Sequence, residues 1–567
     1  MRQKIITVVL AAATAAGLAA LAPGASAETG RGPDGGRGEE RAPTTEVQIL
    51  ALNDFHGQLR PPDSTSSGGR IGATPAGGAE YLAQHVRELE ATNPNSLFVS
   101  AGDLIGATPL VSAIFHDEPS IEAMNLMGLD YNGVGNHEFD EGPEELVRMQ
   151  EGGCHPVDGC FGGDGFEGAD FDFLAANVTY KDTGETIFPP YAIHEFPGVD
   201  VAVVGMTLEG TPGVVTAAAT QNLDFHDEAE SVNALVPVLK EAGVETVVVL
   251  LHEGGNAGTG LNESTVNSCA NPTGPAVDVI KRFDPEIDLV VTGHTNWALN
   301  CPDLAGTGIM VTGAASVGRL VTDVDLTISR ASKEVVGASI NNVIVTRDVE
   351  PASDVTALID RYGEIAAPIE NRVLGTATAP ITRTANAAGE SALGDVIADA
   401  QVWATSGPTW ANGAPAVVSF MNAGGIRADV NAGPITYGEA FSVQPFANVL
   451  VTMDLTGADI DAVLEQQFAG GNGILQIPAS LTYTRSASAP AGSKVSDVRI
   501  NGVPIDPAAT YRVTVNNFLA DGGDGYSVFR NGTNRYVGEI DLDAFARYIE
   551  SVGTVNPGPQ NRITLVP

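Results

Sequence analysis

The stretch "VQILALNDFHG", residues 47–57, joins a continuous apolar run to two polar side chains, Asp54 and His56, and then a glycine. A short apolar run of this kind predicts a β-strand buried on both faces. Helical patterns lie between such runs, as in residues 77–93, where Ala79, Leu82, Val86 and Leu89 recur at helical spacing. The alternation predicts an α/β domain over residues 46–350.

Four later runs end in the same way: "LFVSAGD" (97–103), "YNGVGNHEFD" (131–140), "VVVLLHEGG" (247–255) and "LVVTGHTN" (289–296). The carboxyl ends of strands share one edge of an open α/β sheet, so we expect these polar groups to converge. Each piece alone could be a turn residue or a core histidine, but together they favour a metal site. The candidate ligands are Asp54, His56, Asp103, Asn136, His252, His294 and Asn296.

Carboxylate, imidazole and amide donors without a thiolate suit Zn, Mn, Co or Fe. The set is too large for one tetrahedral ion. Two divalent ions about 3.5–4 Å apart, with one bridging carboxylate, would use it economically.

The motifs "LNDFHG", "GD", "GNHEFD", "H" and "GHTN" resemble those of the calcineurin-like metallophosphoesterases. The first and third match the two signatures of the 5′-nucleotidase family, and the resemblance covers about residues 46 to 565. It implies an α/β/β/α sandwich, a hinge helix at 351–373 and a C-terminal α+β nucleotide-binding domain at 374–567. It also implies that Asp54 and His56 hold one ion, that Asp103 bridges, and that Asn136, His252 and His294 hold the second.

Asn296 stands where many relatives have His or Gln, so contact with either metal or phosphate stays open. His137 would face the phosphate as a transition-state stabiliser and proton donor. Asp140, three residues on, can hydrogen-bond the imidazole and raise its pKa. For Glu138 and Phe139 we expect a solvated charge and a packing role.

In the C-terminal half, "FMNAGGIRADV", "SVQPFANVL" and "NNFLADGGDGY" would by themselves indicate turns, a calcium-like loop and core phenylalanines. The resemblance instead implies that Phe446 and Phe518 stack on the nucleobase and Asp524 contacts the ribose. Asn422 and Arg427 would hold phosphate or sugar. Relatives often have an Arg where this chain has Gly389, and Arg383 is a candidate substitute.

Residues 1–27 have the charged, apolar and A-x-A-like pattern of a secretory signal peptide, with cleavage expected after Ala27. An uncleaved membrane anchor is the alternative. Residues 28–45 predict a flexible leader. The four cysteines suit an exported chain, and local pairing favours Cys154–Cys160 and Cys269–Cys301 among three connectivities. Residues 351–373 predict a connecting helix with an Asp N-cap and little apolar surface.

With 29 basic and 70 acidic residues the net charge is −41, which argues against nucleic acid or an anionic membrane as a partner. We therefore expect a secreted 5′-nucleotidase that hydrolyses nucleoside 5′-monophosphates with a hydroxide activated by two metals. The alternatives are a 2′,3′-cyclic nucleotide phosphodiesterase or a UDP-sugar hydrolase on the same scaffold. A secreted nucleotide-binding protein without turnover is the non-enzyme alternative.

Overall fold

The computed structural model describes residues 43–62, 67–161, 165–407, 415–446, 448–468 and 473–567. The chain from Pro43 to Pro567 forms one compact unit. The predicted signal peptide and residues 28–42 of the predicted leader lie outside the described residues. The first strand begins at Thr44, two residues before the predicted start of the first domain at residue 46. A search of the described helices finds none with the length and hydropathy needed to cross a membrane.

Two six-stranded sheets form the centre of the first domain. The first sheet has the order β16-β15-β1-β4-β5-β6, with bounds Val335–Ile344, Leu320–Ser329, Thr44–Leu52, Ser96–Ser100, Tyr131–Gly133 and Asp172–Leu174. The second has the order β13-β14-β12-β11-β9-β8, with bounds Ala298–Cys301, Met310–Ala314, Leu289–Thr292, Thr246–Leu251, Val199–Met206 and Tyr191–Phe196. The runs β1-β4-β5-β6 and β9-β11-β12-β14 are parallel. Side chains such as Ile49, Val99, Val203 and Leu250 pack together between the two sheets.

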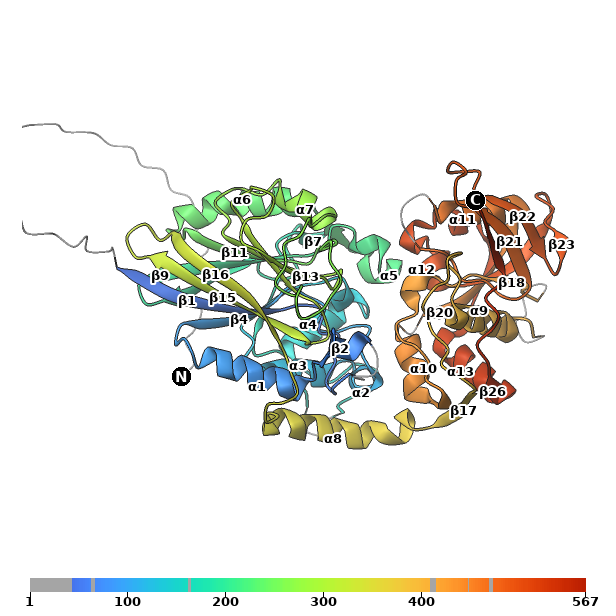
Figure 1. Cartoon of the computed structure of the whole chain (residues 1–567), viewed down its shortest axis with the longest axis horizontal. Helices are drawn as coiled ribbons and strands as arrows, with labels where there is room; N and C mark the ends of the chain where they lie inside the picture. Colours follow the sequence, from blue (N-terminus) through green and yellow to red (C-terminus); the bar gives the residue numbers. More distant parts are fainter. Residues whose placement is uncertain (1–42, 63–66, 162–164, 408–414, 447, 469–472) are drawn as a thin grey trace, which may run out of the picture. The chain divides into compact units, whose positions relative to one another are not determined.

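Helices cover the outer face of each sheet, which confirms the expected α/β/β/α sandwich. One layer contains α1 (Ala79–Glu90), α3 (Glu118–Met127) and α4 (Pro143–Glu151), and the other contains α6 (Glu228–Glu241) and α7 (Pro275–Ile280). Figure 1 shows α1 below β1 and β4, and α6 and α7 above β11. In α1 the predicted apolar stripe faces the core, since Ala79, Leu82 and Val86 are fully buried.

The connecting helix α8 spans Ser353–Glu370 and differs from expectation in two ways. Ala352 occupies the N-cap, and Asp354 lies in the first turn, where it pairs with Arg87. The helix also buries an apolar face, including Val355 and Tyr362, against the first domain. The prediction of little apolar surface on this helix is therefore wrong, because the groove that receives the helix is built by residues far away in the sequence.

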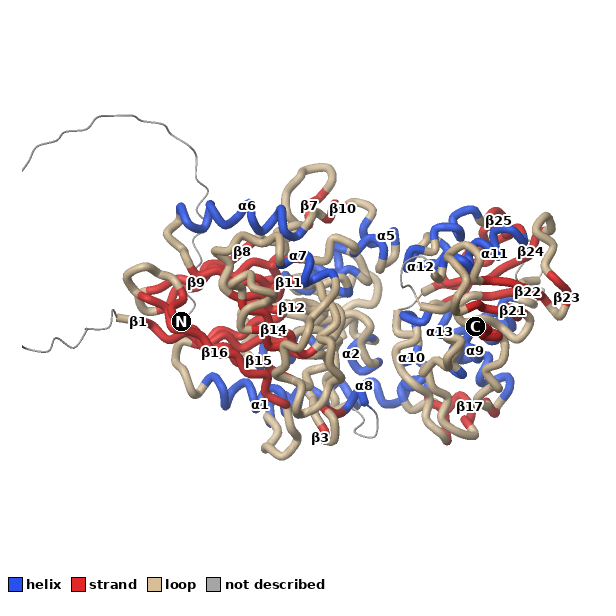
Figure 2. Tube along the Cα trace, turned by 45° about the horizontal axis from the view of Figure 1, so that its top comes forward, coloured by secondary structure: helices blue, strands red, loops and turns tan. Residues whose placement is uncertain are grey.

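The C-terminal domain is α+β, as expected. Within the part of this domain that the structure describes, the sheets have the orders β19-β17-β26, β18-β24-β20-β25 and β23-β22-β21-β27. The first of these sheets contains β19 (Gly433–Thr436), β17 (Val373–Ala377) and β26 (Thr554–Val555). The second contains β18 (Val418–Ser419), β24 (Thr510–Asn516), β20 (Val449–Thr456) and β25 (Thr533–Ile540). The third contains β23 (Val503–Pro504), β22 (Val495–Ile500), β21 (Leu481–Ser486) and β27 (Ile563–Val566). Helices α9 (Ala392–Thr405), α10 (Tyr437–Val443), α11 (Gly457–Gln466), α12 (Asn517–Ala520) and α13 (Asp541–Val552) pack on them (Figure 2).

Both favoured disulfides are present, Cys154–Cys160 and Cys269–Cys301. No described cysteine is free.

Candidate active site

The predicted metal ligands follow strands of both sheets rather than of one. Asp54 and Asp103 come after β1 and β4, and Asn136 comes after β5, all in the first sheet. His252 and His294 come after β11 and β12 of the second sheet. The prediction that the candidate ligands lie at the edge of one sheet is therefore wrong: they lie at the edges of two sheets that pack face to face.

The loops continue the strand pairing, so the ligands stay in register. The backbone N–H of Asp54 donates to Gly102 O at 2.9 Å, and that of His56 donates to Asp103 O at 2.9 Å. Gly102 has φ +89°, and a Cβ on it would lie 2.6 Å from His252 Nδ1 and from Gly135 N. Only glycine permits this approach between the sheets.

The donor atoms form two groups that share one carboxylate. His56, Asp103 and His137 make up one group, and Asp103, His252 and His294 make up the other, with the donor atoms of each group within 4.8 Å of one another. Nε2 of His252 lies 3.1 Å from both Asp103 Oδ2 and Asn136 Oδ1. Asp103 therefore occupies the position expected of a bridging ligand.

Backbone carbonyls orient two of the imidazoles. Nδ1 of His252 donates to Ala101 O at 2.7 Å, and Nδ1 of His56 donates to Gly106 O at 2.8 Å. These hydrogen bonds direct Nε2 of each ring toward the carboxylates, as a metal ligand requires. The left-handed backbone of Asp54, His56, Asp103 and His294 adds to the constraint, with φ between 48° and 66°.

Burial lowers the pKa of His252, but Asp103 and Asp54 outweigh it and raise the value to about 10. Burial dominates at His56, His294 and Asp54. It lowers the pKa of His56 to about 3 and that of His294 to about 4, so both rings are neutral ligands. Burial also raises the pKa of Asp54 to about 7. Oδ1 of Asp54 has no hydrogen-bond partner among the described residues. A divalent cation would satisfy this oxygen, so the residues present fit metal binding.

His137 and Asp140 form the predicted pair. Nδ1 of His137 lies 2.8 Å from Asp140 Oδ2, and the backbone N–H of His137 donates to Asp103 Oδ1 at 2.9 Å. Burial lowers the pKa of His137, but Asp140 and Asp103 outweigh it and the net shift is upward.

The prediction that Glu138 is a solvated charge is wrong. Its side chain is buried and accepts hydrogen bonds from the backbone N–H groups of Asp103 (2.9 Å), Leu104 (2.8 Å) and Gly135 (2.8 Å). The carboxylate therefore joins the loop of Asp103 to the loop of Asn136. Phe139 is fully buried, as expected for packing.

Asn296 is exposed and has a left-handed backbone with φ 56°. Its contact with metal or phosphate remains a prediction.

A pocket brings together residues predicted from both halves of the sequence. Asn422, Arg427, Phe446, Phe518 and Asp524 line it, together with Asn136, His137, Asp140 and His294. Asn422 Nδ2 donates to Asp524 Oδ2 at 2.9 Å, and the Phe446 and His137 rings stack with their centroids 5.6 Å apart. Asn448 and residues 214–216 also line the pocket and were not predicted. Asn448 lies inside the stretch that supplied Phe446, whereas "VVT" at 214–216 carries no polar pattern that could have indicated it.

An arginine at Gly389 would be strained in this structure. The φ of Gly389 is +90°, and a Cβ would lie 2.3 Å from Ile474 Cγ1. Arg383 lies near Arg427, because its Nη1 donates to Ile426 O at 3.1 Å. This position would allow Arg383 to take the role of an arginine at position 389.

Comparisons with known proteins agree with this architecture. The family model for the calcineurin-like phosphoesterase matches residues 47–297, and that for the 5′-nucleotidase C-terminal domain matches residues 373–531. The chain is 33% identical over 514 residues to "Endonuclease YhcR" of Bacillus subtilis, covering 89% of this chain and 40% of that protein. It is 32% identical over 550 residues to "Cell wall protein Lmo0130" of Listeria monocytogenes, covering 90% of this chain and 67% of that protein.

Among solved structures, the 5′-nucleotidase precursor from Thermus thermophilus superposes with a TM-score of 0.74 at 27% identity. The match covers 92% of this chain and 99% of that one. Fold and site thus define a metallophosphoesterase, the class of hydrolases that act on phosphoester bonds. The chain belongs to the 5′-nucleotidase family, which implies divalent metal ions as cofactors.

Proposed function

We propose that this chain is an exported, dimetal 5′-nucleotidase that converts nucleoside 5′-monophosphates to nucleoside and phosphate. The observation that carries the proposal is Asp103, which belongs to two donor groups and lies beside the His137–Asp140 pair. Asp54, His56, Asp103, Asn136, His252 and His294 would hold two ions, Zn, Mn, Co or Fe. When bound, these ions supply an acidified water and neutralise charge on the phosphoryl oxygens.

The side chains around the ions have separate tasks. Asp140 accepts a hydrogen bond from Nδ1 of His137, which leaves Nε2 of that ring to donate to a phosphoryl oxygen. Arg427 adds positive charge to the pocket, and this favours an anionic substrate despite the net charge of −41. Phe446 and Phe518 offer aromatic faces to a nucleobase, a contact that tolerates any base.

Phosphate release from 5′-AMP, with and without a chelator, tests the proposal. We expect release that the chelator abolishes and that Mn or Zn restores. Asp103→Asn should be inactive under all conditions, because it removes the shared ligand. A chain that releases phosphate from no phosphoester after addition of Mn or Zn would instead be a nucleotide-binding protein.

Diester hydrolysis is the second candidate, since a relative with 33% identity is named an endonuclease. Parallel assays with 2′,3′-cyclic AMP, UDP-glucose and single-stranded DNA separate it from the first. Higher kcat/KM for 5′-AMP than for all three supports the nucleotidase. The opposite order supports the diesterase.

Export is supported by the pattern of residues 1–27 and by the two disulfides. A relative with 32% identity is named a cell wall protein. N-terminal sequencing of protein secreted by the native host, expected to start after Ala27, tests this part separately.

A further inference from the structure

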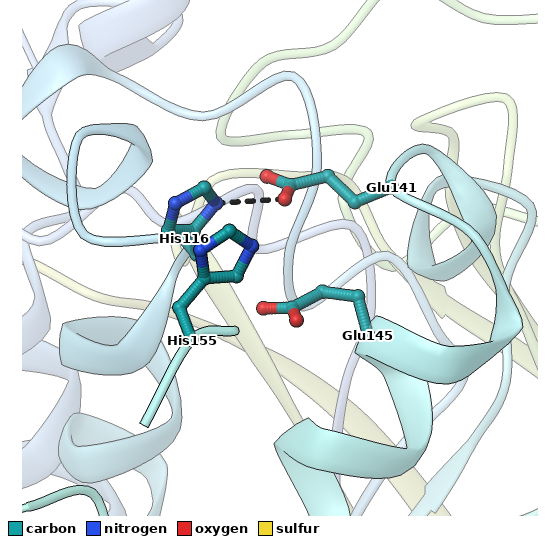
Figure 3. A group of neighbouring side chains, drawn as sticks. All are labelled: His116, Glu141, Glu145 and His155. Carbon is teal, nitrogen blue, oxygen red and sulfur yellow. Dashed lines mark hydrogen bonds and ion pairs between the residues drawn. The ribbon is translucent and has the colours of Figure 1, made fainter. Parts of the chain in front are cut away.

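A second group of imidazoles and carboxylates lies outside the active site. His116, Glu141, Glu145 and His155 each offer one donor atom, and these four atoms lie within 4.8 Å of one another. Figure 3 shows both carboxylates pointing toward the two imidazole rings. Ligand atoms of a tetrahedral zinc ion, each about 2.0–2.2 Å from the metal, lie about 3.4 Å apart, so the four side chains would have to close around an ion.

The backbone around these side chains is constrained. His155 lies within the loop closed by the Cys154–Cys160 disulfide. His116 has a left-handed backbone with φ 49°, and the next residue, Asp117, is held by hydrogen bonds from Gly106 N (3.0 Å) and Thr108 Oγ1 (2.7 Å). The four side chains are thus presented by fixed loops and by the start of α4, not by mobile termini.

Asp158, in the same disulfide loop, contacts both imidazoles from outside the group. Its Oδ2 lies 3.0 Å from His116 Nε2 and 3.3 Å from His155 Nδ1, and its backbone N–H donates to the same His155 Nδ1 at 3.1 Å. Histidines that bind metals usually donate their other ring N–H to a carboxylate, and Nε2 of His116 is placed to donate to Asp158 in this way. With Nε2 of His116 so engaged, its Nδ1 faces Glu141 Oε2 at 2.7 Å.

The charges of the group call for a cation. The two imidazole rings stack with centroids 3.7 Å apart and an interplanar angle of 16°, so protonating both would place like charges in contact. Three carboxylates surround them, those of Glu141, Glu145 and Asp158. Among the described residues, only Glu145 has a cationic partner from outside the group: Arg148 donates from Nη2 to its Oε1 at 2.6 Å and from Nε to its Oε2 at 2.9 Å.

We propose that His116, His155, Glu141 and Glu145 form a third metal site, structural in role, that takes a Zn²⁺-like divalent cation. Two imidazole nitrogens and two carboxylate oxygens make a closed four-ligand set of the kind that zinc accepts. Glu145 keeps lone pairs for the ion while it pairs with Arg148.

The position of the site indicates what the ion would do. Glu141 directly follows Asp140, the partner of His137, so the ion would tie the disulfide loop to the turn that carries this pair. The site therefore acts on catalysis only by positioning.

Metal stoichiometry tests the inference independently of phosphate release. Full-length chain is stripped, dialysed against Zn²⁺ and analysed by elemental mass spectrometry, as wild type, Glu141→Gln and His155→Ala. We expect each variant to hold about one equivalent less than wild type. Glu144→Gln is the matched control, because Glu144 lies on α4 beside Glu145 but is exposed and outside the group. The metal stoichiometry of this variant should equal that of wild type.

A second comparison separates this site from the active site. Asp103→Asn should keep about one equivalent of Zn²⁺, and the double variant Asp103→Asn/Glu141→Gln should keep almost none. Equal metal content in wild type and Glu141→Gln would overturn the inference, as would a metal-free Asp103→Asn chain. Glu141 is half exposed, so its substitution by Gln should not prevent folding. Thermal unfolding with and without Zn²⁺ checks this point.

Discussion

His137 and Asp140 illustrate how much one residue contributes to this site. His137 belongs to a group of donor atoms with His56 and Asp103, yet its Nδ1 is already engaged by Asp140. We predict that His137→Ala keeps its metal but loses kcat by about 10²–10⁴-fold, because a proton donor to the phosphoryl oxygens is removed. Metal content and kcat for 5′-AMP, measured on one preparation, provide the test. Loss of metal in proportion to activity would make His137 a ligand instead.

Glu138 supports the site without facing the substrate. Gln at this position retains only one acceptor oxygen for the backbone N–H groups of Asp103, Leu104 and Gly135. We predict that Glu138→Gln lowers the free energy of unfolding by roughly 1–3 kcal/mol, the cost of a buried unsatisfied group. It should also weaken metal retention, because two ligand loops lose their connection. Urea unfolding and metal analysis measure both effects, with the exposed Glu144→Gln as control. Unchanged values for Glu138→Gln would contradict this role.

At the scale of elements, the strands and their ligands could be predicted because each carries its own local pattern. β1, β4, β11 and β12 are apolar runs, and a candidate metal ligand follows each of them within three residues. The burial of Glu138 could not be predicted, since two of its donors come from residues 103 and 104, far away in the sequence. For the same reason, nothing in the sequence pattern indicates that His116 and Glu141 meet His155.

Helix α8 offers a direct test of its corrected packing. Tyr362 is fully buried, packs edge-on against Phe115 with ring centroids 4.8 Å apart, and donates its hydroxyl to Glu122 Oε1 at 3.0 Å. We predict that Tyr362→Ala costs about 3–5 kcal/mol in the unfolding of the first domain. Ile365→Ala, on the exposed side of the same helix, should change it by no more than about 0.5 kcal/mol. Similar unfolding midpoints for the two variants would mean that α8 is not anchored as described.

Helix α9 carries a buried carboxyl group, that of Asp395, whose charged form is disfavoured by burial. Burial raises the pKa of Asp395 to about 8, with Arg562 opposing and Glu390 adding to the shift. A folded-state pKa above the unfolded value means that the neutral form stabilises the fold at low pH. This stabilisation is lost as the pH rises through about 8. We predict a decline in unfolding free energy from about pH 4, the unfolded pKa, to about pH 8, the folded pKa, that is smaller in Asp395→Asn. Parallel pH profiles for the two proteins would refute the assignment.

For the whole molecule, the proposed metal ligands and the proposed base-stacking residues lie in different domains. The metal donors all precede residue 300, whereas Phe446 and Phe518 belong to the C-terminal domain. Removing a base-stacking ring should therefore weaken nucleotide binding without changing the chemistry of phosphate release. Loss of one stacking contact corresponds to about 1–3 kcal/mol, or roughly 5–150-fold in KM for 5′-AMP.

Phe518→Ala should show this rise in KM while metal content stays constant, and Phe446→Ala should resemble it. Ribose 5-phosphate has no base, so its kcat/KM should be the same in wild type and both variants. Trp403→Ala removes an aromatic ring of the same domain that does not line the pocket, and it should leave KM for both substrates unchanged. If Phe518→Ala impaired ribose 5-phosphate as much as 5′-AMP, its ring would support the fold of the site rather than bind the base, and the aromatic residues would no longer argue for a nucleotide substrate.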